Sequence, residues 1–343
     1  MQTTLVIGSA DRGKTTLVAK WARAAASEGG VTFVLDTDIG QSELGPPTTI
    51  GLAKALPTVE RLHDLKAEAL FWVGALSPSA AALEHVVACA RAAELARKLG
   101  AERLLIDTPG WVSGPAARRW LAALAQALRP QTIVGVGEPG ELDGLLKMLC
   151  ASCGATAERV APPEGVTRKP AGMRATRRST RLAKALENSR PLALPLDAVP
   201  TLGATLGTGV PLPPEQRRWC ASALKSPVVH AEQSDGVLSV FHLGPLRKDW
   251  DALTGPVAYH FHLRSVRPLA IAAYEGVLLG LHDAGGKLLG LGRFSGIEPD
   301  RGELLLTTPL LDAARERIAL IAFGRLRCAP DGSQPKELKP GEI

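Results

Sequence analysis

The sequence of 343 residues has no apolar run long enough to cross a membrane, and it is poor in cysteine and in aromatic residues. A transmembrane helix needs about 18 consecutive apolar residues, so no membrane span is predicted. Five cysteines are too few for a disulfide scaffold, and the one C-x-x-C pair, Cys150 and Cys153, has no second pair at zinc spacing. Aromatic residues make up 4% of the chain, which argues against a long stacking surface for single strands. These absences, with an N-terminus unlike a signal peptide, predict a cytoplasmic protein.

The charge of the chain is concentrated in one segment. The chain carries 40 Lys and Arg against 34 Asp and Glu, a formal net charge of +6. Residues 164–190 contain eight basic and two acidic side chains, so this segment accounts for the whole excess. A concentrated basic element predicts an anionic partner that binds at one place. Its basic residues are Arg168, Lys169, Arg174, Arg177, Arg178, Arg181, Lys184 and Arg190.

The length predicts two domains, because 343 residues exceed one ordinary hydrophobic core. In the first, apolar strands alternate with helices rich in Ala and Leu as far as about residue 136. This alternation predicts an α/β domain with a mostly parallel sheet flanked by helices. The strands are expected at 4–8, 31–35, 70–74, 103–107 and 132–136, and the helices at 14–27, 80–99 and 115–128.

The second half of the chain has a different texture. Residues 191–225 are rich in Pro and Gly and are interpreted as a connection. Beyond it, short apolar runs broken by turns predict a smaller β-rich domain over 226–343. The first domain is then 1–190, with an Arg-rich helical lid at about 164–190.

Two histidines of the β-rich part, His260 and His262, alternate within "YHFHL". A strand there would point both side chains to one side, and a metal pair is one interpretation. No third ligand follows at useful spacing.

The segment "GSADRGKTT", residues 8–16, fits G-x-x-x-x-G-K-S/T and lies between a predicted strand and a predicted helix. In that context the backbone N–H groups and the helix N-terminus cradle phosphates. We expect Lys14 to reach the β- and γ-phosphates and the Thr15 hydroxyl to ligate Mg²⁺. The pattern identifies a P-loop NTPase domain. Its nucleotide site is predicted to comprise Gly8, Asp11, Arg12, Gly13, Lys14, Thr15 and Thr16.

A second carboxylate ends a buried strand in "RLLIDTPGW". Asp107 is the expected direct or water-mediated Mg²⁺ contact opposite a P-loop, although it could also cap a turn before Pro109. The tetrad Asp107 to Gly110 also fits the D-x-x-G of GTPases. A GTPase should carry N/T-K-x-D after a later strand, and "VGVGEPGELDG" has none. The GTPase interpretation is weakened accordingly.

The stretch "FVLDTDIGQSELGPP" ends another strand in two carboxylates, Asp36 and Asp38. Both are expected to face the γ-phosphate side of the P-loop, because parallel α/β sheets bind ligands at this edge. A carboxylate there can hold Mg²⁺ or accept the proton of an attacking hydroxyl. Alternatively, both could cap a turn or a helix. Gly40 permits close backbone approach, and Gln41 offers an amide to a phosphate or a hydroxyl.

Four arginines, Arg174, Arg177, Arg178 and Arg181, fall on one face of a predicted helix. A solvated face is the ordinary interpretation of such a run. However, no acidic residue lies among them to form i, i+4 pairs, so their mutual repulsion is unrelieved within the helix. Arginine suits bidentate phosphate contacts. The stripe is therefore expected to lie over triphosphate or nucleic-acid phosphates.

An ordered set of motifs runs along nearly the whole chain: "GSADRGKTT", "DTDIGQSELGPPTT", "GALSPS", "DTPGW" and "GTGVPL". Together they resemble the polynucleotide 5′-hydroxyl kinases, relatives of the kinase subunit of the mRNA 3′-end cleavage factor and of pre-rRNA processing kinases, in a short form of bacterial or archaeal type. The resemblance implies that the γ-phosphate of ATP is transferred, with Mg²⁺, to the 5′-OH end of RNA or DNA.

The resemblance also implies roles for single residues. Asp38 matches the general base and a metal contact, and Gln41 matches a contact to the terminal phosphate of the acceptor. Thr108 and Trp111 match the T-x-G-W motif on the substrate side. An Arg-rich lid belongs after the core, where Arg178 and Arg181 fit R-x-x-R best and Arg174 and Arg177 follow closely.

Two other functions fit parts of the pattern. A P-loop ATPase or GTPase that works as a switch or scaffold shares the P-loop, the Asp after the second strand and D-x-x-G, and it needs no polynucleotide acceptor. A kinase of a small alcohol, such as a nucleoside, would not depend on oligonucleotide length. The basic lid and D-x-G-Q favour the polynucleotide kinase.

Overall fold

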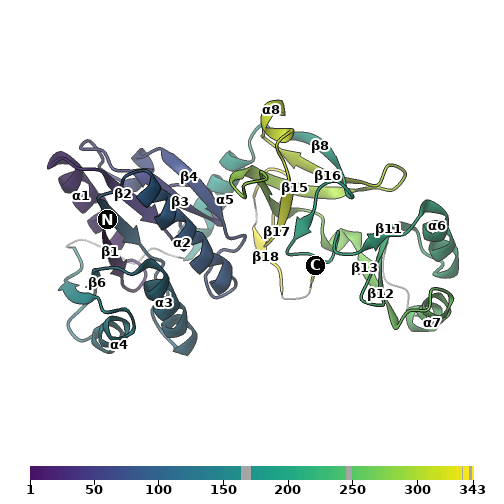
Figure 1. The fold of residues 1–343 in the computed structure, drawn as a ribbon, viewed down its shortest axis with the longest axis horizontal. Coiled ribbons are helices and arrows are strands. Elements are labelled where there is room, and N and C mark those ends of the chain that lie inside the picture. Colours follow the sequence, from purple (N-terminus) through teal and green to yellow (C-terminus); the bar gives the residue numbers. More distant parts are fainter. Residues whose placement is uncertain (164–170, 245–248, 334, 340–341) are drawn as a thin grey trace. The chain divides into compact units, whose positions relative to one another are not determined.

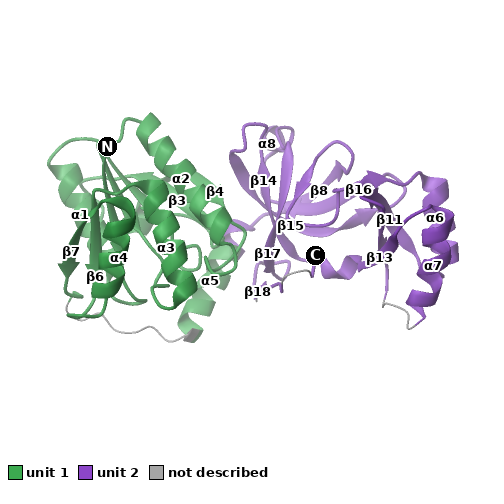
Figure 2. Cartoon of the chain, turned by 60° about the horizontal axis from the view of Figure 1, so that its bottom comes forward, with its two compact units in different colours: residues 1–182 green, residues 183–343 purple. Residues whose placement is uncertain are grey.

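The structure is a computed structural model that describes residues 1–163, 171–244, 249–333, 335–339 and 342–343. The chain divides into two units, residues 1–182 and 183–343, which Figure 2 distinguishes by colour. The basic residues Arg168 and Lys169, and with them the expected start of the lid, lie outside the described residues.

Unit 1 is built around a seven-stranded sheet with the strand order β4-β3-β2-β5-β1-β6-β7. Five neighbouring strands are parallel, and β3 and β4 extend the sheet antiparallel at one edge. The strands are β1 (Gln2–Ile7), β2 (Thr32–Asp36), β3 (Thr49–Lys54), β4 (Ala67–Trp72), β5 (Arg103–Asp107), β6 (Thr132–Val136) and β7 (Thr156–Val160). The helices are α1 (Lys14–Ser27), η1 (Leu62–Asp64), α2 (Ala82–Lys98), α3 (Pro115–Leu128), α4 (Asp143–Cys153) and α5 (Ala171–Ala185).

The strand period of two explains why helices cover both faces of this sheet. In β1, Leu5 and Ile7 point to the face packed by α2, α3 and α4, whereas Val6 points to the face packed by α1. All three side chains are fully buried. Figure 1 shows these helices beside the strands. The predicted α/β class with a mostly parallel sheet is confirmed.

Unit 2 contains two sheets, in the orders β10-β11-β12-β13 and β18-β17-β14-β15-β16-β8, with β9 also paired to β17. The strands are β8 (Arg190–Pro195), β9 (Thr201–Leu202), β10 (Val210–Pro211), β11 (Val228–Ser234), β12 (Val237–His242), β13 (Ser265–Ala270), β14 (Val277–His282), β15 (Leu288–Glu298), β16 (Glu303–Thr308), β17 (Leu320–Arg327) and β18 (Lys336–Glu337). The helical segments are α6 (Pro214–Ala223), α7 (Trp250–His260), η2 (Ile271–Ala273) and α8 (Asp312–Arg315). The predicted β-rich C-terminal part is confirmed.

The segment expected as a connection, 191–225, instead contributes β9, β10, α6 and most of β8 to unit 2. Its prolines are compatible with strands because β8 and β10 are edge strands, where a missing N–H leaves no ladder bond unmade. Pro191 and Pro195 both lie in β8, which pairs with β16 alone. The high Pro content of this segment therefore reflects edge strands and not a connection without secondary structure.

The prediction of a strand at "YHFHL" is wrong, because helix α7 ends at His260. His262 lies two residues further on, in the left-handed conformation with φ 55°. Gly255 and Pro256 inside the helix obscured its periodicity, although Trp250 and Val257 are buried seven residues apart. The two histidines do not share a strand face. Within the described residues, no group of three His, Cys, Asp or Glu side chains is placed to hold a metal ion. No described helix is long and apolar enough to span a bilayer.

Candidate active site

Three loops meet at the carboxyl edge of the unit 1 sheet, because β2, β5 and β1 are direct neighbours. The register pairs Asp107 of β5 with Val6 of β1 on one side and with Asp36 of β2 on the other. The P-loop, the "DTDIGQ" loop and the "DTPGW" loop therefore start side by side. Ligand sites of parallel α/β sheets lie at this edge.

The P-loop places a lysine among carboxylates at the start of α1. Gly13 caps the helix in the left-handed conformation, with φ 82°, which favours glycine. Lys14 is 6% exposed, and its Nζ donates a hydrogen bond to the Ser9 carbonyl at 2.9 Å. Burial lowers the pKa of Lys14, while nearby Asp107 and Asp38 oppose that shift. The ammonium group lies where it can turn from a backbone carbonyl to a phosphate.

Other residues of the P-loop are fixed by neighbouring elements. Arg12 forms ion pairs with Glu141 at 2.9 Å and Glu138 at 3.8 Å, in the loop after β6. A Cβ on Gly8 would lie 2.4 Å from the Val136 carbonyl oxygen, so only glycine fits there. Thr16 is exposed on the first turn of α1.

Asp107 and Thr15 form a set of oxygen donors beside the P-loop. Thr15 Oγ1 donates to Asp107 Oδ2 at 2.5 Å, and Asp107 Oδ1 is buried with no hydrogen-bond partner among the described residues. Burial and the nearby Asp36 raise the pKa of Asp107 to about 7, against the effect of Lys14. An unpartnered carboxylate oxygen next to a hydroxyl is a suitable ligand set for a hard divalent cation.

Asp36, which was expected to face the phosphate side, is 1% exposed, and its carboxylate is occupied by the loop after β2. Its Oδ2 accepts hydrogen bonds from Ser42 Oγ and from the Glu43 and Leu44 N–H groups, and its Oδ1 accepts one from the Asp38 N–H. A carboxylate with four donors serves as the centre of the loop after β2. Turn capping, the alternative interpretation, describes Asp36 better.

Asp38 is only half-buried. Its Oδ1 accepts hydrogen bonds from the Gly40 N–H at 3.1 Å and the Gln41 N–H at 2.9 Å. No described residue donates a hydrogen bond to its second oxygen. A Cβ on Gly40 would lie 2.5 Å from the Leu76 carbonyl, which explains the glycine of D-x-G-Q and links it to the "GALSPS" segment.

The "DTPGW" loop packs directly on the P-loop. A Cβ on Gly110 would lie 2.5 Å from the Ala10 backbone nitrogen. The Thr108 hydroxyl donates to the Val6 carbonyl at 2.7 Å and is buried, so it ties this loop to β1. Trp111 is half-buried at the start of the following segment. The substrate contacts expected of Thr108 and Trp111 stay predictions.

Helix α5 carries the arginine stripe, and three of its arginines pair with carboxylates of the core. Arg174 pairs with Asp11 at 2.5 Å, while Arg177 and Arg181 pair with Glu43 at 2.5 and 3.1 Å. The acidic partners that the helix itself lacks thus come from the P-loop and from the loop after β2. The phosphate role of the stripe stays a prediction.

Two further contacts complete the region around α5. Gln41 Nε2 donates to the Gly40 carbonyl at 2.9 Å and, more weakly, to the Arg174 carbonyl at 3.4 Å. Arg178 forms no ion pair with a described residue, and its buried Nε has no hydrogen-bond partner among them. Of the four arginines, Arg178 is therefore the one that pairs with no carboxylate in the described part of the chain.

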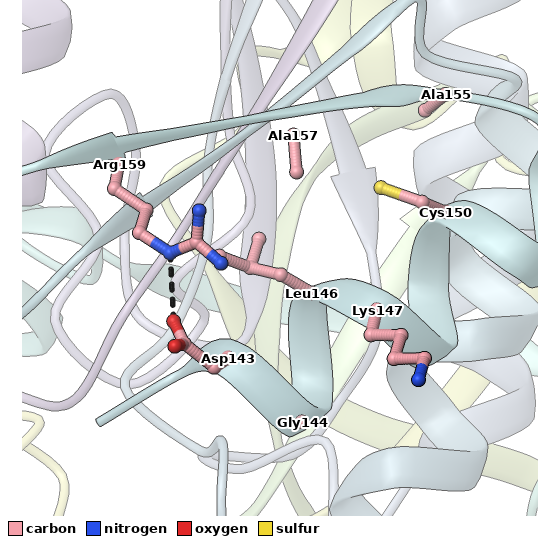
Figure 3. Close-up of a pocket in the computed structure, with 8 residues that line it drawn as sticks. All are labelled: Asp143, Gly144, Leu146, Lys147, Cys150, Ala155, Ala157 and Arg159. Carbon is pink, nitrogen blue, oxygen red and sulfur yellow. Dashed lines mark hydrogen bonds and ion pairs between the residues drawn. The ribbon is translucent and has the colours of Figure 1, made fainter. Parts of the chain in front are cut away.

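A groove between α4 and β7 contains none of the predicted site residues (Figure 3). Across it Arg159 Nε donates to Asp143 Oδ1 at 2.7 Å, and both side chains are more than half exposed. Cys150 also lines it. The predicted site residues of unit 1 lie at the carboxyl edge of the sheet, and none of them lines this groove.

The phosphate loop on a parallel sheet, with a buried carboxylate and a separate half-buried one at the same edge, defines a P-loop nucleotide-binding protein. The chain belongs to the family described as mRNA cleavage and polyadenylation factor CLP1 P-loop, whose model matches residues 8–188. The resemblance found in the sequence is confirmed.

Relatives extend the similarity to the whole chain. The polyribonucleotide 5′-hydroxyl-kinase of Thermococcus kodakarensis is 30% identical over 99% of this chain and 92% of its own length. That of Pyrococcus horikoshii is 27% identical over 97% and 87%. A solved Clp1p–Pcf11p complex contains a chain with a TM-score of 0.58 at 9% identity, covering 95% of this chain and 74% of that one. This last likeness shows the fold.

Sequence reasoning missed three residues around the site: Glu43, His85 and Trp120. Glu43 could have been found, because it is the carboxylate nearest in sequence to Gln41 and the arginine stripe needs one. His85 and Trp120 lie in apolar helices with no motif around them. Only the fold brings them beside the loop after β2.

Proposed function

We propose that the protein is an ATP-dependent polynucleotide 5′-hydroxyl kinase that transfers the γ-phosphate of ATP to the 5′-OH end of RNA. The proposal rests on one observation above all. A half-buried carboxylate with an uncommitted oxygen, Asp38, lies at the same sheet edge as a complete P-loop and a metal-ligand set. The names of the relatives support the acceptor class.

The residues of this chain divide the reaction between them. The P-loop N–H groups and Lys14 bind the β- and γ-phosphates. Thr15 and Asp107 would hold Mg²⁺, which supplies neutralisation of the phosphate charge when bound. Asp38 accepts the proton of the attacking 5′-hydroxyl through its uncommitted oxygen. Arg178, which forms no ion pair with a described residue, contacts the transferring phosphoryl group.

The acceptor end is assigned to the loop that carries Asp38 and to the "DTPGW" loop after the neighbouring strand β5. Gln41 follows Asp38 in the first loop, Trp111 ends the second motif, and both side chains are only half-buried. In this proposal the Gln41 amide contacts the first phosphate of the strand, and the Trp111 ring contacts its first base or sugar. Arg174, Arg177 and Arg181 exchange carboxylate partners for phosphates on binding.

The test is phosphate transfer from γ-labelled ATP, with Mg²⁺, to a 5′-OH oligoribonucleotide, with the DNA of the same sequence beside it. Lys14→Ala and Asp38→Asn should abolish end-labelling, while Glu60→Gln, an exposed carboxylate outside the site, should leave it unchanged. ATP hydrolysis without end-labelling would refute the kinase and favour a switch ATPase. Labelling of a free nucleoside as efficiently as of the oligonucleotide would favour a small-alcohol kinase.

A further inference from the structure

A chain of aromatic and hydrogen-bonded side chains runs from the "DTPGW" loop into the core. The ring of Trp111 stacks on that of Trp120, with centroids 5.5 Å apart and an interplanar angle of 25°. Trp120 Nε1 donates a hydrogen bond to His85 Nδ1 at 3.3 Å. His85 Nε2 in turn lies 2.9 Å from the carbonyl oxygen of Thr37, the residue before Asp38.

The hydrogen bonds fix the tautomer of His85. An indole N–H can only donate, so Nδ1 accepts, and the proton lies on Nε2, which donates to the Thr37 carbonyl. The imidazole is fully buried, and burial lowers its pKa to about 4. Cys89 Sγ lies 3.6 Å from the same Nδ1. His85 is therefore neutral at neutral pH and works as a fixed link between Trp120 and the backbone.

Thr37 is held on its other side by β5. Its backbone N–H and its hydroxyl donate to the Asp107 carbonyl at 3.0 and 2.8 Å. The next N–H, that of Asp38, donates to Asp36 Oδ1 at 3.1 Å. The Thr37 carbonyl accepts two hydrogen bonds, one from the Ile39 N–H at 3.1 Å and one from His85 Nε2. The peptide unit that carries Asp38 is thus fixed at every polar atom, and His85 supplies the contact from α2.

The surrounding core does not require a polar chain. Apart from Cys89, helices α2 and α3 present mainly aliphatic side chains here, including the fully buried Ala92, Leu121 and Leu124. Aliphatic residues at 85 and 120 would fill such a layer without desolvating polar atoms, which costs free energy. A role in positioning explains why the polar side chains of His85 and Trp120 lie between the "DTPGW" loop and the loop after β2.

We propose that His85 and Trp120 are positioning residues for the acceptor strand, which hold the Trp111 ring and the Asp38 carboxylate in one fixed relation. The inference rests on the proposed function, since that function places Trp111 and Asp38 on the acceptor side. Neither His85 nor Trp120 touches the reacting atoms. They act on the affinity for the acceptor strand, by keeping the site in the arrangement that binds the strand with its 5′-hydroxyl next to Asp38.

The experiment compares steady-state constants for both substrates in four variants. His85→Leu removes both hydrogen bonds, Trp120→Phe keeps a stacked ring but removes the N–H, and His85→Gln retains a donor for the Thr37 carbonyl. Leu124→Val is the control, because it loosens the same face of α3 but leaves the hydrogen bonds and the ring stacking of Trp111, Trp120 and His85 in place. Thermal unfolding and the Kd for the 5′-OH oligonucleotide without ATP are measured for all.

We expect His85→Leu and Trp120→Phe to raise both the KM and the Kd for the oligonucleotide by at least about 3- to 10-fold, because Trp120→Phe loses one hydrogen bond of the series and His85→Leu loses two. The KM for ATP should stay within about two-fold, and His85→Gln should recover most of the acceptor affinity. If both variants lose stability as Leu124→Val does but keep the acceptor KM and Kd, the chain is only core packing and the inference is wrong. A wild-type protein that labels no oligonucleotide would instead refute the proposed function, and the positioning role with it.

Discussion

At the scale of single residues, the two carboxylates of "DTD" have opposite environments. Asp36 is buried with four hydrogen-bond donors, whereas Asp38 is half-buried with one oxygen uncommitted. Asp38→Asn should therefore lower kcat by about 100- to 10,000-fold, the usual effect of losing a general base, without changing the free energy of unfolding. Labelling of a 5′-OH oligonucleotide and urea unfolding measure the two quantities.

The isosteric change at the neighbouring position is the matched comparison. Asp36→Asn should lower the free energy of unfolding by about 1–3 kcal/mol, because an amide nitrogen cannot accept the bonds of the Glu43 and Leu44 N–H groups. If Asp36→Asn proved as stable as the wild type, the assignment of Asp36 to loop structure would be wrong.

His85 makes stability depend on pH in a defined direction. Its pKa is lowered to about 4 in the folded protein by burial, whereas an unfolded histidine titrates near an ordinary value of about 6.5. Between these values the unfolded chain binds a proton that the folded protein does not, so stability falls as pH falls through this window. We expect His85 alone to remove about 2 kcal/mol of stability between pH 7 and pH 5.

Urea unfolding at both pH values measures this loss, and His85→Gln is its control. Glutamine does not titrate, so the variant should lose less stability than the wild type on acidification, whatever its stability at pH 7. Equal losses in the two proteins would show that His85 is not the responsible group.

At the scale of elements, helix α5 pairs with two carboxylates of unit 1, and one of them is shared between two arginines. Glu43 pairs with Arg177 and Arg181, and the Glu43 side chain is 14% exposed. Glu43→Gln should release this hold because an amide cannot neutralise two guanidinium groups. We expect trypsin to cleave within α5 several-fold faster in the variant without nucleotide, since cleavage follows local opening.

The control for this release is Glu60→Gln, which removes an exposed carboxylate of unit 1. It should leave the cleavage rate unchanged. If trypsin cleaved Glu43→Gln no faster than the wild type, the ion pairs of Glu43 would contribute nothing to the docking of α5. Many surface ion pairs contribute nothing measurable to stability.

The elements with an unambiguous pattern were predictable from the sequence. The expected bounds of β5, β6, α1 and α3 agree with the structure, because apolar strands ended at carboxylates or turns and Pro or Gly marked the helix ends. The strand β3 was missed, since "TIGLAK" is short and follows the Pro-rich loop that the motifs dominated. Helix α4 and strand β7 were missed as well, because β7 is an exposed edge strand without apolar alternation.

The site was predictable where a motif fixes backbone geometry, and less so where side chains meet across the fold. The P-loop, Asp38 and Asp107 come together because their strands are neighbours, which the α/β class already implies. A carboxylate near Gln41 could be anticipated as a partner of α5, but the pairing of Glu43 with Arg181 could not, since the two are far apart in sequence and meet only through tertiary structure. The same holds for His85 and Trp120.

At the scale of the whole molecule, each unit has hydrophobic clusters of its own. Two clusters lie entirely within unit 1 and two within unit 2. Calorimetry of the full chain should therefore show two unfolding transitions. Only the one that belongs to unit 1 should rise with ADP and Mg²⁺, by about 2.7 kcal/mol in stability at 100 times the Kd.

Lys14→Ala is the control for this shift, because it removes the phosphate contact without altering unit 2. The variant should show two transitions that ADP leaves in place. A single transition that ADP moves as a whole would show that the two units unfold together.

The contacts of Gly40 and Gly110 have a consequence for anyone who redesigns this chain. A side chain at 110 would collide with the backbone of Ala10, and one at 40 with the carbonyl of Leu76. The four segments are thus fitted together in two pairs at the level of the main chain. Loops transplanted from another P-loop protein would have to be exchanged pair by pair, because the backbone of one member leaves no room for a side chain on the other.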